Sequence, residues 1–318
     1  MCPFHGNTHT PSFAVSKLSG EYLCFNGACA EFGSLLELVK ATLKVKDFEA
    51  MRIIVQAKDN TVVSFKEKLQ LALAPPTEFD SFPQKTVDRM KVDFWDDSIG
   101  LEYMRGRGFE DSTLRDFSIG YSRKRNQIAL PMHTADGVLI GVVGRSADKD
   151  IKIFKNSKNL HTSKTLLNLH RAKRTGSTVI VVESGFDMMM LTQIGYPNTV
   201  ACLGGNFSPV HQWQLDKYFS TIIIMTDFDD KDTHKYAGCR KCARKGLKSC
   251  RGHNPGRALG ETISERLSNK KILWAAYDHK VVYPHGAKDV NNMTDAENRQ
   301  CLKNAVSNFE YHQWGIDS

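Results

Sequence analysis

The sequence lacks any apolar run long enough to span a bilayer, and its first residues, MCPFHGNTHT, include no hydrophobic segment of a signal peptide. It also lacks internal repeats and long low-complexity tracts. These absences argue against membrane, secreted and repeat proteins, so we expect a soluble, cytoplasmic protein with no membrane partner. A chain of 318 residues can form about two or three domains, each with its own core.

Most of the cysteine residues are grouped. Six of the eight cysteines lie in two groups that also contain histidine. In a reducing compartment this pattern favours metal ligation over a disulfide framework. Cys202 and Cys301 stand outside both groups, and we expect them to be buried as small hydrophobic side chains.

Basic residues are concentrated in two regions. Residues 101–175 contain fifteen Lys and Arg against seven Asp and Glu, and residues 231–257 contain nine against Asp232 alone. The net charge of the whole chain is +8, so everything outside these regions is net acidic. Concentrated positive charge favours nucleic acid as a partner, because Lys and Arg displace counterions from phosphates. The alternative is two solvated basic faces.

The first group of metal ligands consists of Cys2, His5, Cys24 and Cys29, two pairs separated by eighteen residues. Each pair lies on a predicted tight turn, so the four side chains can complete a tetrahedron around zinc. Because the protein fills all four positions, we expect a structural site that stabilises a small ribbon. The alternative is four unrelated residues.

The second group, Cys239, Cys242, Cys250 and His253, again has two pairs, here separated by seven residues. This spacing predicts a zinc knuckle, a compact loop held by a second structural zinc ion. The alternative is a flexible basic loop with free thiols.

Three blocks of different character follow one another, which predicts an α/β, multi-domain protein. The first has a strand and turn, GEYLCFNGACAEFG, and a helix for which Ser34 is a candidate N-cap. The second has alternating strands, NQIALPMH and VLIGVVG, around the turn TADG. From about Gly176, short apolar runs alternate with helical stretches, which indicates a parallel sheet covered on both faces.

Carboxylates follow two of the predicted parallel strands. Glu183 ends TVIVVE, Asp187 begins the next helix, and Asp227 and Asp229 end TIIIMTDFD. The carboxyl ends of parallel strands meet at one edge of a sheet, so these acids are expected to lie together. Clustered carboxylates with open coordination positions suit Mg²⁺ or Mn²⁺. The alternative is a set of helix caps and surface turn acids.

Three sets of motifs resemble the DnaG-type primases of bacteria and phages. VVESGFD, ACLGG and IIMTDFDD are similar to the Toprim domain, and CPFH, TPSF, YLCF and the next cysteine are similar to that family's CHC2-type zinc ribbon. Between them, YMRGRGFEDSTLRDFSIGY, QIALPMHTADGVLIGVVGR, IFKNSK and KTLLNLH follow the order of the basic half of the family's RNA polymerase domain. The resemblance covers nearly the whole chain.

The resemblance implies a domain order. The fold expected is an N-terminal zinc ribbon, a mixed α+β basic subdomain and a Rossmann-like Toprim sheet that carries the zinc knuckle as an insertion. The predicted ranges are 1–74 for the zinc-binding domain, 75–90 for a linker, 91–175 for the basic subdomain, 176–300 for the Toprim domain with its insertion at 231–257, and 301–318 for a C-terminal tail.

The resemblance also implies residue roles. Glu183, Asp227 and Asp229 match the Toprim glutamate and the paired aspartates that hold Mg²⁺ or Mn²⁺, and Asp187 and Asp289 match further acids on the metal side. A second set is expected to contact nucleotide or template phosphates: Arg105, Arg145, Lys152, Lys155, Asn156 and Lys164. Positive side chains there would neutralise the triphosphate and the template backbone.

The sequence departs from the family pattern at several places. Ile153 stands where the family has a lysine, and Asn291 stands where it often has a second acid. The zinc motif begins at residue 2, so we expect a truncated or misassigned start. Fewer than thirty residues follow Asp289. We therefore expect the helical tail and any helicase-binding domain to be absent or reduced, as in a phage or mobile-element enzyme acting in the host cytoplasm.

The function that the resemblance implies is RNA primer synthesis on single-stranded DNA during replication, a metal-dependent nucleotidyl transfer from NTPs. The expected partners are template, NTPs, the RNA primer and a replicative helicase. The ribbon would contact template through side chains such as Lys17, Tyr22 and Phe25, and the inserted knuckle would add a second contact beside the acids. The alternatives are a Toprim-type nuclease or topoisomerase, and a non-catalytic zinc-containing DNA-binding accessory protein.

Overall fold

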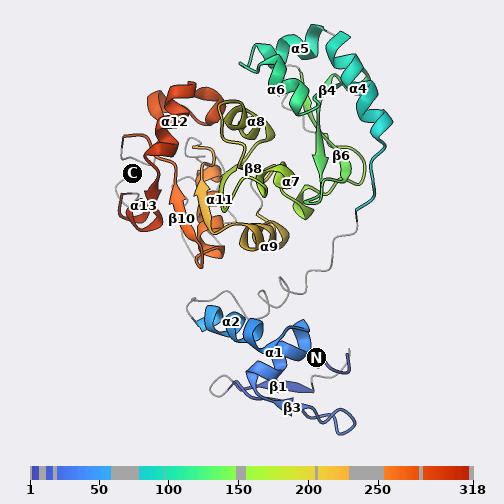
Figure 1. Cartoon of the computed structure of the whole chain (residues 1–318), viewed down its shortest axis with the longest axis vertical. Helices are drawn as coiled ribbons and strands as arrows, with labels where there is room; N and C mark the ends of the chain where they lie inside the picture. Colours follow the sequence, from blue (N-terminus) through green and yellow to red (C-terminus); the bar gives the residue numbers. More distant parts are fainter. Residues whose placement is uncertain are drawn as a thin grey trace, which may run out of the picture. The chain divides into compact units, whose positions relative to one another are not determined.

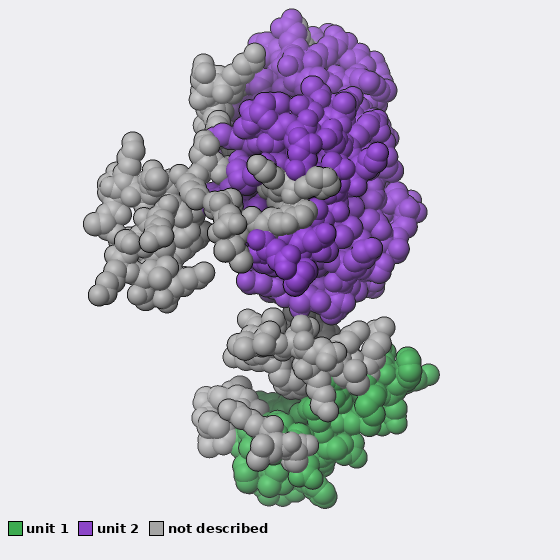
Figure 2. Space-filling model, turned by 90° about the vertical axis from the view of Figure 1, so that its left-hand side faces the viewer, with its two compact units in different colours: residues 1–75 green, residues 76–318 purple. Residues whose placement is uncertain are grey.

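The computed structural model describes residues 2–6, 12–16, 20–58, 79–96, 98–147, 155–204, 207–228, 254–278 and 282–314. The chain divides into two compact units, residues 1–75 and residues 76–318 (Figures 1 and 2). Among the described residues, no helix is long and apolar enough to cross a membrane. The two units are described separately below.

Unit 1 is a small antiparallel sheet followed by two helices. Its elements are β1 (Phe13–Val15), β2 (Tyr22–Cys24), β3 (Phe32–Gly33), α1 (Leu35–Leu43) and α2 (Asp47–Lys58), with β2 in the centre of the sheet. Helix α1 begins where the sequence predicts. The Ser34 hydroxyl accepts a hydrogen bond from the Glu37 N–H, and the Glu37 carboxylate accepts one from the Ser34 N–H.

Tyr22 belongs to the core of unit 1. It is 5% exposed, and its ring stacks on those of Phe4 and Phe13, with centroids 5.3 and 5.4 Å apart. The expectation that Tyr22 stacks on template bases is therefore wrong, because its faces are already covered by aromatic neighbours. Phe25 is 68% exposed, and Lys17 lies outside the described residues.

The first part of unit 2 packs helices on an antiparallel sheet. Its elements are α4 (Gln84–Asp96), α5 (Ser98–Arg105), α6 (Asp111–Asp116), β4 (Gly120–Ser122), η1 (Arg123–Arg125), β5 (Gln127–His133), β6 (Leu139–Ser146), η2 (Thr162–Lys164) and α7 (Leu169–Ala172). The strand order is β4-β5-β6, and β5 and β6 pair antiparallel across TADG. The predicted hairpin is confirmed.

The second part of unit 2 is a five-stranded sheet with helices on both faces. Its elements are β7 (Thr178–Val182), α8 (Gly185–Gln193), β8 (Thr199–Ala201), α9 (Pro209–Tyr218), β9 (Thr221–Ile224), α11 (Pro255–Arg266), β10 (Lys271–Trp274), η3 (Pro284–Gly286), η4 (Val290–Asn292), α12 (Asp295–Lys303), β11 (Val306–Ser307) and α13 (Asn308–Trp314). The order is β11-β10-β9-β7-β8, and β7, β8, β9 and β10 run parallel. The predicted parallel sheet is confirmed, with antiparallel β11 added at one edge.

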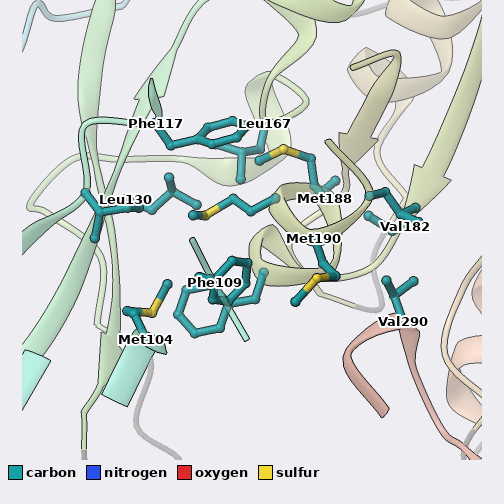
Figure 3. Close-up of a cluster of buried hydrophobic side chains, with 14 of the residues drawn as sticks. Met104, Phe109, Phe117, Leu130, Leu167, Val182, Met188, Met190 and Val290 are labelled. Atoms are coloured by element: carbon teal, nitrogen blue, oxygen red, sulfur yellow. The ribbon is translucent and has the colours of Figure 1, made fainter. Parts of the chain in front are cut away.

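Strand β7 separates two buried clusters. Val179 and Val181 face the cluster built with α9 and α11, whereas Ile180 and Val182 face the one built with α8 and α12. This alternation follows from the two-residue period of a strand. The second cluster continues into the antiparallel sheet, and in Figure 3 Leu130 from β5 and the α8 methionines fill the same core. The two sheets therefore form one folded body.

The domain limits expected from the sequence differ from the described elements in two places. Residues 75–90 were expected to be a linker, but α4 begins at Gln84 because Val87 is buried against Ala129 and Val142. Residues 301–318 were expected to be a tail, but β11 pairs with β10, which fixes α13 beside the sheet. Cys202 and Cys301 are both buried, as expected.

Replacing Tyr311 with alanine is expected to destabilise unit 2 by about 3 kcal/mol, the loss typical of a large buried aromatic side chain. Tyr311 is 3% exposed, and its ring lies parallel to that of Trp274 at 3.7 Å. The matched control is Phe309→Ala in the same helix, which should change stability by less than about 0.5 kcal/mol because Phe309 is 70% exposed. Denaturant unfolding followed by Trp fluorescence compares the two, and equal stability would contradict this packing.

Candidate active site

The ribbon residues of unit 1 form a compact ligand set. The Sγ atoms of Cys2 and Cys29 are 3.9 Å apart, and Cys24 Sγ is 3.7 Å from His5 Nδ1. Ligands of one tetrahedral zinc ion with Zn–S bonds of about 2.3 Å lie about 3.8 Å apart. In the part of the chain that the structure describes, this is the one group of three or more Cys, His, Asp or Glu residues whose ligand atoms all lie within 4.8 Å. The four residues therefore fit a zinc ion.

In unit 2, the ends of β7 and β9 bring two acids to the same edge. The strands are parallel neighbours with Val181 beside Ile224, so Glu183 and Asp227 follow them in the same direction. The Glu183 main-chain oxygen accepts hydrogen bonds from the N–H groups of Leu203 and Gly204, at 2.9 and 3.4 Å. The ACLGG turn after β8 thus fixes the backbone that carries Glu183.

The other two acids are fixed by helix starts. Asp187 lies in the first turn of α8, where its N–H donates to the Ser184 hydroxyl and its carboxylate accepts from that hydroxyl. Asp289 caps η4 by accepting from the Asn292 N–H at 3.0 Å. The Phe228 N–H donates to the Lys288 oxygen at 2.6 Å, which holds the Asp289 loop beside the end of β9.

One cavity of about 490 Å³ collects these groups. Four of the five predicted catalytic acids line it: Glu183, Asp187, Asp227 and Asp289. Its walls also include positive and amide side chains: Arg107, Arg145, Asn156 and Asn291. Asp229 lies outside the described residues. The cavity therefore presents acids together with basic groups, as expected of a site for a cation and an anionic substrate.

The environment of Asp187 raises the pKa of its carboxyl group. Burial raises the pKa of Asp187, which is 2% exposed, to about 6, and the charge of Asp289 adds to the effect. A bound divalent cation would offset both costs, so the oxygen donors fit Mg²⁺ or Mn²⁺. The Asn291 amide donates to Asp187 at 2.5 Å. Where an acid would repel Asp187, Asn291 therefore stabilises its charged form.

Two arginines that line the cavity with the acids lie close to one aromatic ring. The guanidinium groups of Arg107 and Arg145 lie 5.4 and 5.0 Å from the ring centroid of Phe186, which lies in the first turn of α8. The Nε of Arg107 is buried and has no hydrogen-bond partner among the described residues. A buried donor without an acceptor carries a large cost, so this group suits an anionic ligand.

The sequence motif predicts a phosphate contact for Arg105, but Arg107 is the arginine of this motif that lines the cavity. Arg105 is the last residue of α5, and its guanidinium makes a two-pronged contact with Asp111 at 2.8 and 2.6 Å. It does not line the cavity. Gly106 and Gly108, the latter at φ +85°, flank Arg107 and let the chain turn after the helix. The glycine on each side of Arg107 is the signal that could have identified it.

The other residues predicted to contact phosphates do not all lie at this cavity. Asn156 lines the cavity. Lys155 beside it is solvent-exposed, and its N–H pairs with the Gly144 oxygen at 3.0 Å. Lys164 lines a different cavity, with Phe79 and His161. Lys152 lies outside the described residues.

The residues of the predicted second zinc site, Cys239, Cys242, Cys250 and His253, lie outside the described residues. The chain that follows them returns to the acids. A Cβ atom on Gly256 would lie 2.1 Å from the Asp227 oxygen, so only glycine allows this approach. Arg257 then stacks over Tyr311 at 4.3 Å and Phe228 at 5.4 Å. The described residues at the C-terminal end of the insertion therefore lie beside Asp227.

Comparisons with known proteins agree with this arrangement. A CHC2 zinc finger of the DnaG zinc-ribbon type matches residues 1–70, and a Toprim domain matches residues 177–248. The DNA primase of Clostridium acetobutylicum is 26% identical over 277 residues, covering 72% of this chain and 45% of the relative. The DNA primase of Legionella pneumophila is 27% identical over 274 residues, covering 72% and 46%. The chain thus spans less than half the length of these curated relatives.

Solved structures show the same fold. The Aquifex aeolicus primase, with zinc-binding and RNA polymerase domains, matches 97% of this chain and 79% of its own, with a TM-score of 0.52 and 21% identity. A DNA primase domain from Pseudomonas aeruginosa matches 72% of this chain and 79% of its own, with a TM-score of 0.53 and 18% identity.

A zinc ribbon followed by a basic antiparallel subdomain and a Toprim sheet defines a class of multi-domain α/β proteins with an acidic site at the sheet edge. This chain has those parts in that order. In these parts the chain is similar to the DnaG-type primases.

Proposed function

We propose that this protein is a DNA primase, a DNA-directed RNA polymerase that makes short RNA primers on single-stranded DNA from NTPs during replication. The observation that carries the proposal is the cavity in which four carboxylates lie with Arg107, Arg145 and Asn156. Nucleotidyl transfer needs cations at the reacting phosphate and positive side chains around the rest of the triphosphate.

The acids have different roles in cation binding. Glu183, Asp227 and Asp229 would hold Mg²⁺ or Mn²⁺, which when bound activates a 3′-hydroxyl and stabilises the departing pyrophosphate. Asp187 and Asp289 add negative charge on the same side, and Asn291 keeps Asp187 oriented through its amide hydrogen bond. The main-chain contacts at Glu183 and Phe228 keep the ligands in place before substrate arrives.

Arg107 and Arg145 would bind the phosphate groups of the nucleotide. Arg107 and Arg145 are held over the Phe186 ring, which limits their rotation and favours bonding to phosphate oxygens. The Asn156 oxygen is buried without a partner among the described residues and suits a donor on ribose or base. The zinc ribbon would select template, the inserted knuckle would bind template or primer beside the acids, and a replicative helicase would be the protein partner.

The test is an assay with single-stranded DNA template, labelled ribonucleotides and Mg²⁺ or Mn²⁺. Wild type should make oligoribonucleotides, and Asp227→Ala with Asp229→Ala should abolish them. A lack of acid-dependent product with either metal would rule out the primase proposal. Acid-dependent cleavage of the DNA would instead identify a Toprim nuclease, and template binding without either reaction would identify an accessory protein.

In the same assay, Arg107→Gln is expected to lower kcat/KM for NTPs by about 10²-fold, the loss typical of one removed charge-stabilising donor. The matched control is Arg105→Gln, two residues away, which should stay within about threefold of wild type because Arg105 bonds Asp111 outside the cavity. Equal losses in the two variants would show that Arg107 acts only through the general positive field.

A further inference from the structure

Unit 2 contains a second cavity, of about 330 Å³, between β5 and α7. Leu130 lines both this cavity and the acidic one. None of the predicted catalytic acids and none of the predicted phosphate-contact residues lines it. The residues that line it are therefore not explained by primer synthesis.

Two histidines from different elements meet in its wall. His133 ends β5 and His170 lies in α7, and their ring centroids are 4.6 Å apart at an interplanar angle of 42°. Two imidazole rings at this separation are close enough for one small ligand to contact both. No hydrogen bond joins the two rings in the described structure.

Two buried polar atoms at this cavity have no partner among the described residues: the Nδ1 of His170 and the Oδ1 of Asn168. Asn168 is 3% exposed, and its amide N–H donates to the Thr199 oxygen at 2.9 Å, which leaves the Oδ1 as the unbonded end. Buried polar atoms are nearly always bonded in native proteins. Both residues line this cavity, so a ligand bound there would lie next to two residues that have unbonded polar atoms.

We propose that His133 and His170 bind one divalent transition-metal ion, such as Zn²⁺, Ni²⁺ or Co²⁺, in this cavity. Imidazole nitrogen is a preferred donor for these ions and a poor one for Mg²⁺. The site would thus take a different class of ion from the acidic cavity. Water molecules would complete the coordination.

The surroundings permit a cation despite nearby basic residues. Arg171 is paired with Asp116, and Lys173 is paired with Asp136 at 3.1 Å. Arg174 is solvent-exposed, where water and salt screen its charge. Burial lowers the pKa of His170 to about 4 and that of His133 below its ordinary value, so both rings are neutral at pH 7 and keep a lone pair for a metal.

The experiment titrates Ni²⁺ into the full-length, zinc-loaded protein by isothermal calorimetry. Wild type should bind one equivalent that His133→Gln and His170→Asn each weaken by more than about tenfold, since even loss of a supporting contact costs about that much. Asn168→Gly can keep the left-handed backbone conformation at φ 66°. This variant should weaken Ni²⁺ binding less than either histidine variant does. The matched control is His161→Asn, an exposed histidine in another cavity, which should bind like wild type.

Unchanged binding in both histidine variants would overturn the proposal, as would equal weakening in the His161 control, which would indicate adventitious surface chelation. A measurement on wild type alone covers the case of a variant that does not fold. With ¹⁵N label in histidine only, Zn²⁺ should shift the ring signals of His133 and His170 and leave that of His161 in place. Unshifted His133 and His170 signals would also overturn it.

Discussion

If the chain is the proposed primase, Glu183→Gln is expected to reduce the rate of primer synthesis by about 10²- to 10³-fold, the loss typical of removing one preorganised group that stabilises transition-state charge. The side chain remains nearly isosteric, but one negative charge is lost from the edge where β7 and β9 end. A neutral amide binds a hard divalent cation less tightly than a carboxylate. Single-turnover primer extension over a range of Mg²⁺ and Mn²⁺ concentrations measures the effect.

The matched control for Glu183→Gln is Glu261→Gln, the same chemical change at an exposed position of α11. The control should retain wild-type rates at all metal concentrations. Glu261→Gln should unfold at the wild-type denaturant midpoint. Glu183→Gln should unfold at that midpoint or slightly above it, because removing one of several clustered carboxylates relieves repulsion. Wild-type activity in Glu183→Gln would mean that the acids at this edge do not hold the catalytic ions.

The sheet edge shows how much of the site could be predicted from the sequence. Glu183 and Asp227 could be placed together because parallel neighbouring strands end at one edge, a rule that needs only the strand assignments. Asp289 could be attached only through the family resemblance. Its position depends on the Phe228 to Lys288 main-chain hydrogen bond, which joins segments far apart in sequence and has no local pattern.

The basic residues of the site were also hard to predict, because their positions depend on contacts between segments far apart in the sequence. Arg105 and Arg107 lie in one short motif, and composition alone does not show which one faces the acids. The choice depends on where α5 ends, on the Asp111 side chain that binds Arg105, and on the packing of Phe186 under Arg107. The expected role for Tyr22 failed in a similar way, because an aromatic residue on a ribbon strand can face either the core or solvent.

Removing zinc is expected to unfold unit 1 while unit 2 stays folded. Among its described residues, the buried hydrophobic side chains of unit 1 are few: Cys2, Tyr22, Cys24, Leu38, Val39 and Ala50. Two of the six are metal ligands, so the apolar core alone is too small to offset the entropy of folding. Structural zinc contributes about 10–16 kcal/mol in small zinc-dependent folds, which exceeds the stability of most small domains.

Cys24→Ser tests this dependence without a chelator, because it removes one ligand from the centre of the ribbon sheet. Hydrogen exchange read by mass spectrometry should show loss of protection over β1 to β3 and full retention over β7 and β9, since the two units have separate cores. The control Phe32→Ala, at a 75% exposed position of the same sheet, should keep protection and zinc content. Persistent protection of β1 to β3 in metal-free Cys24→Ser would show that the ribbon folds without its ion, and zinc would then serve a role other than stability.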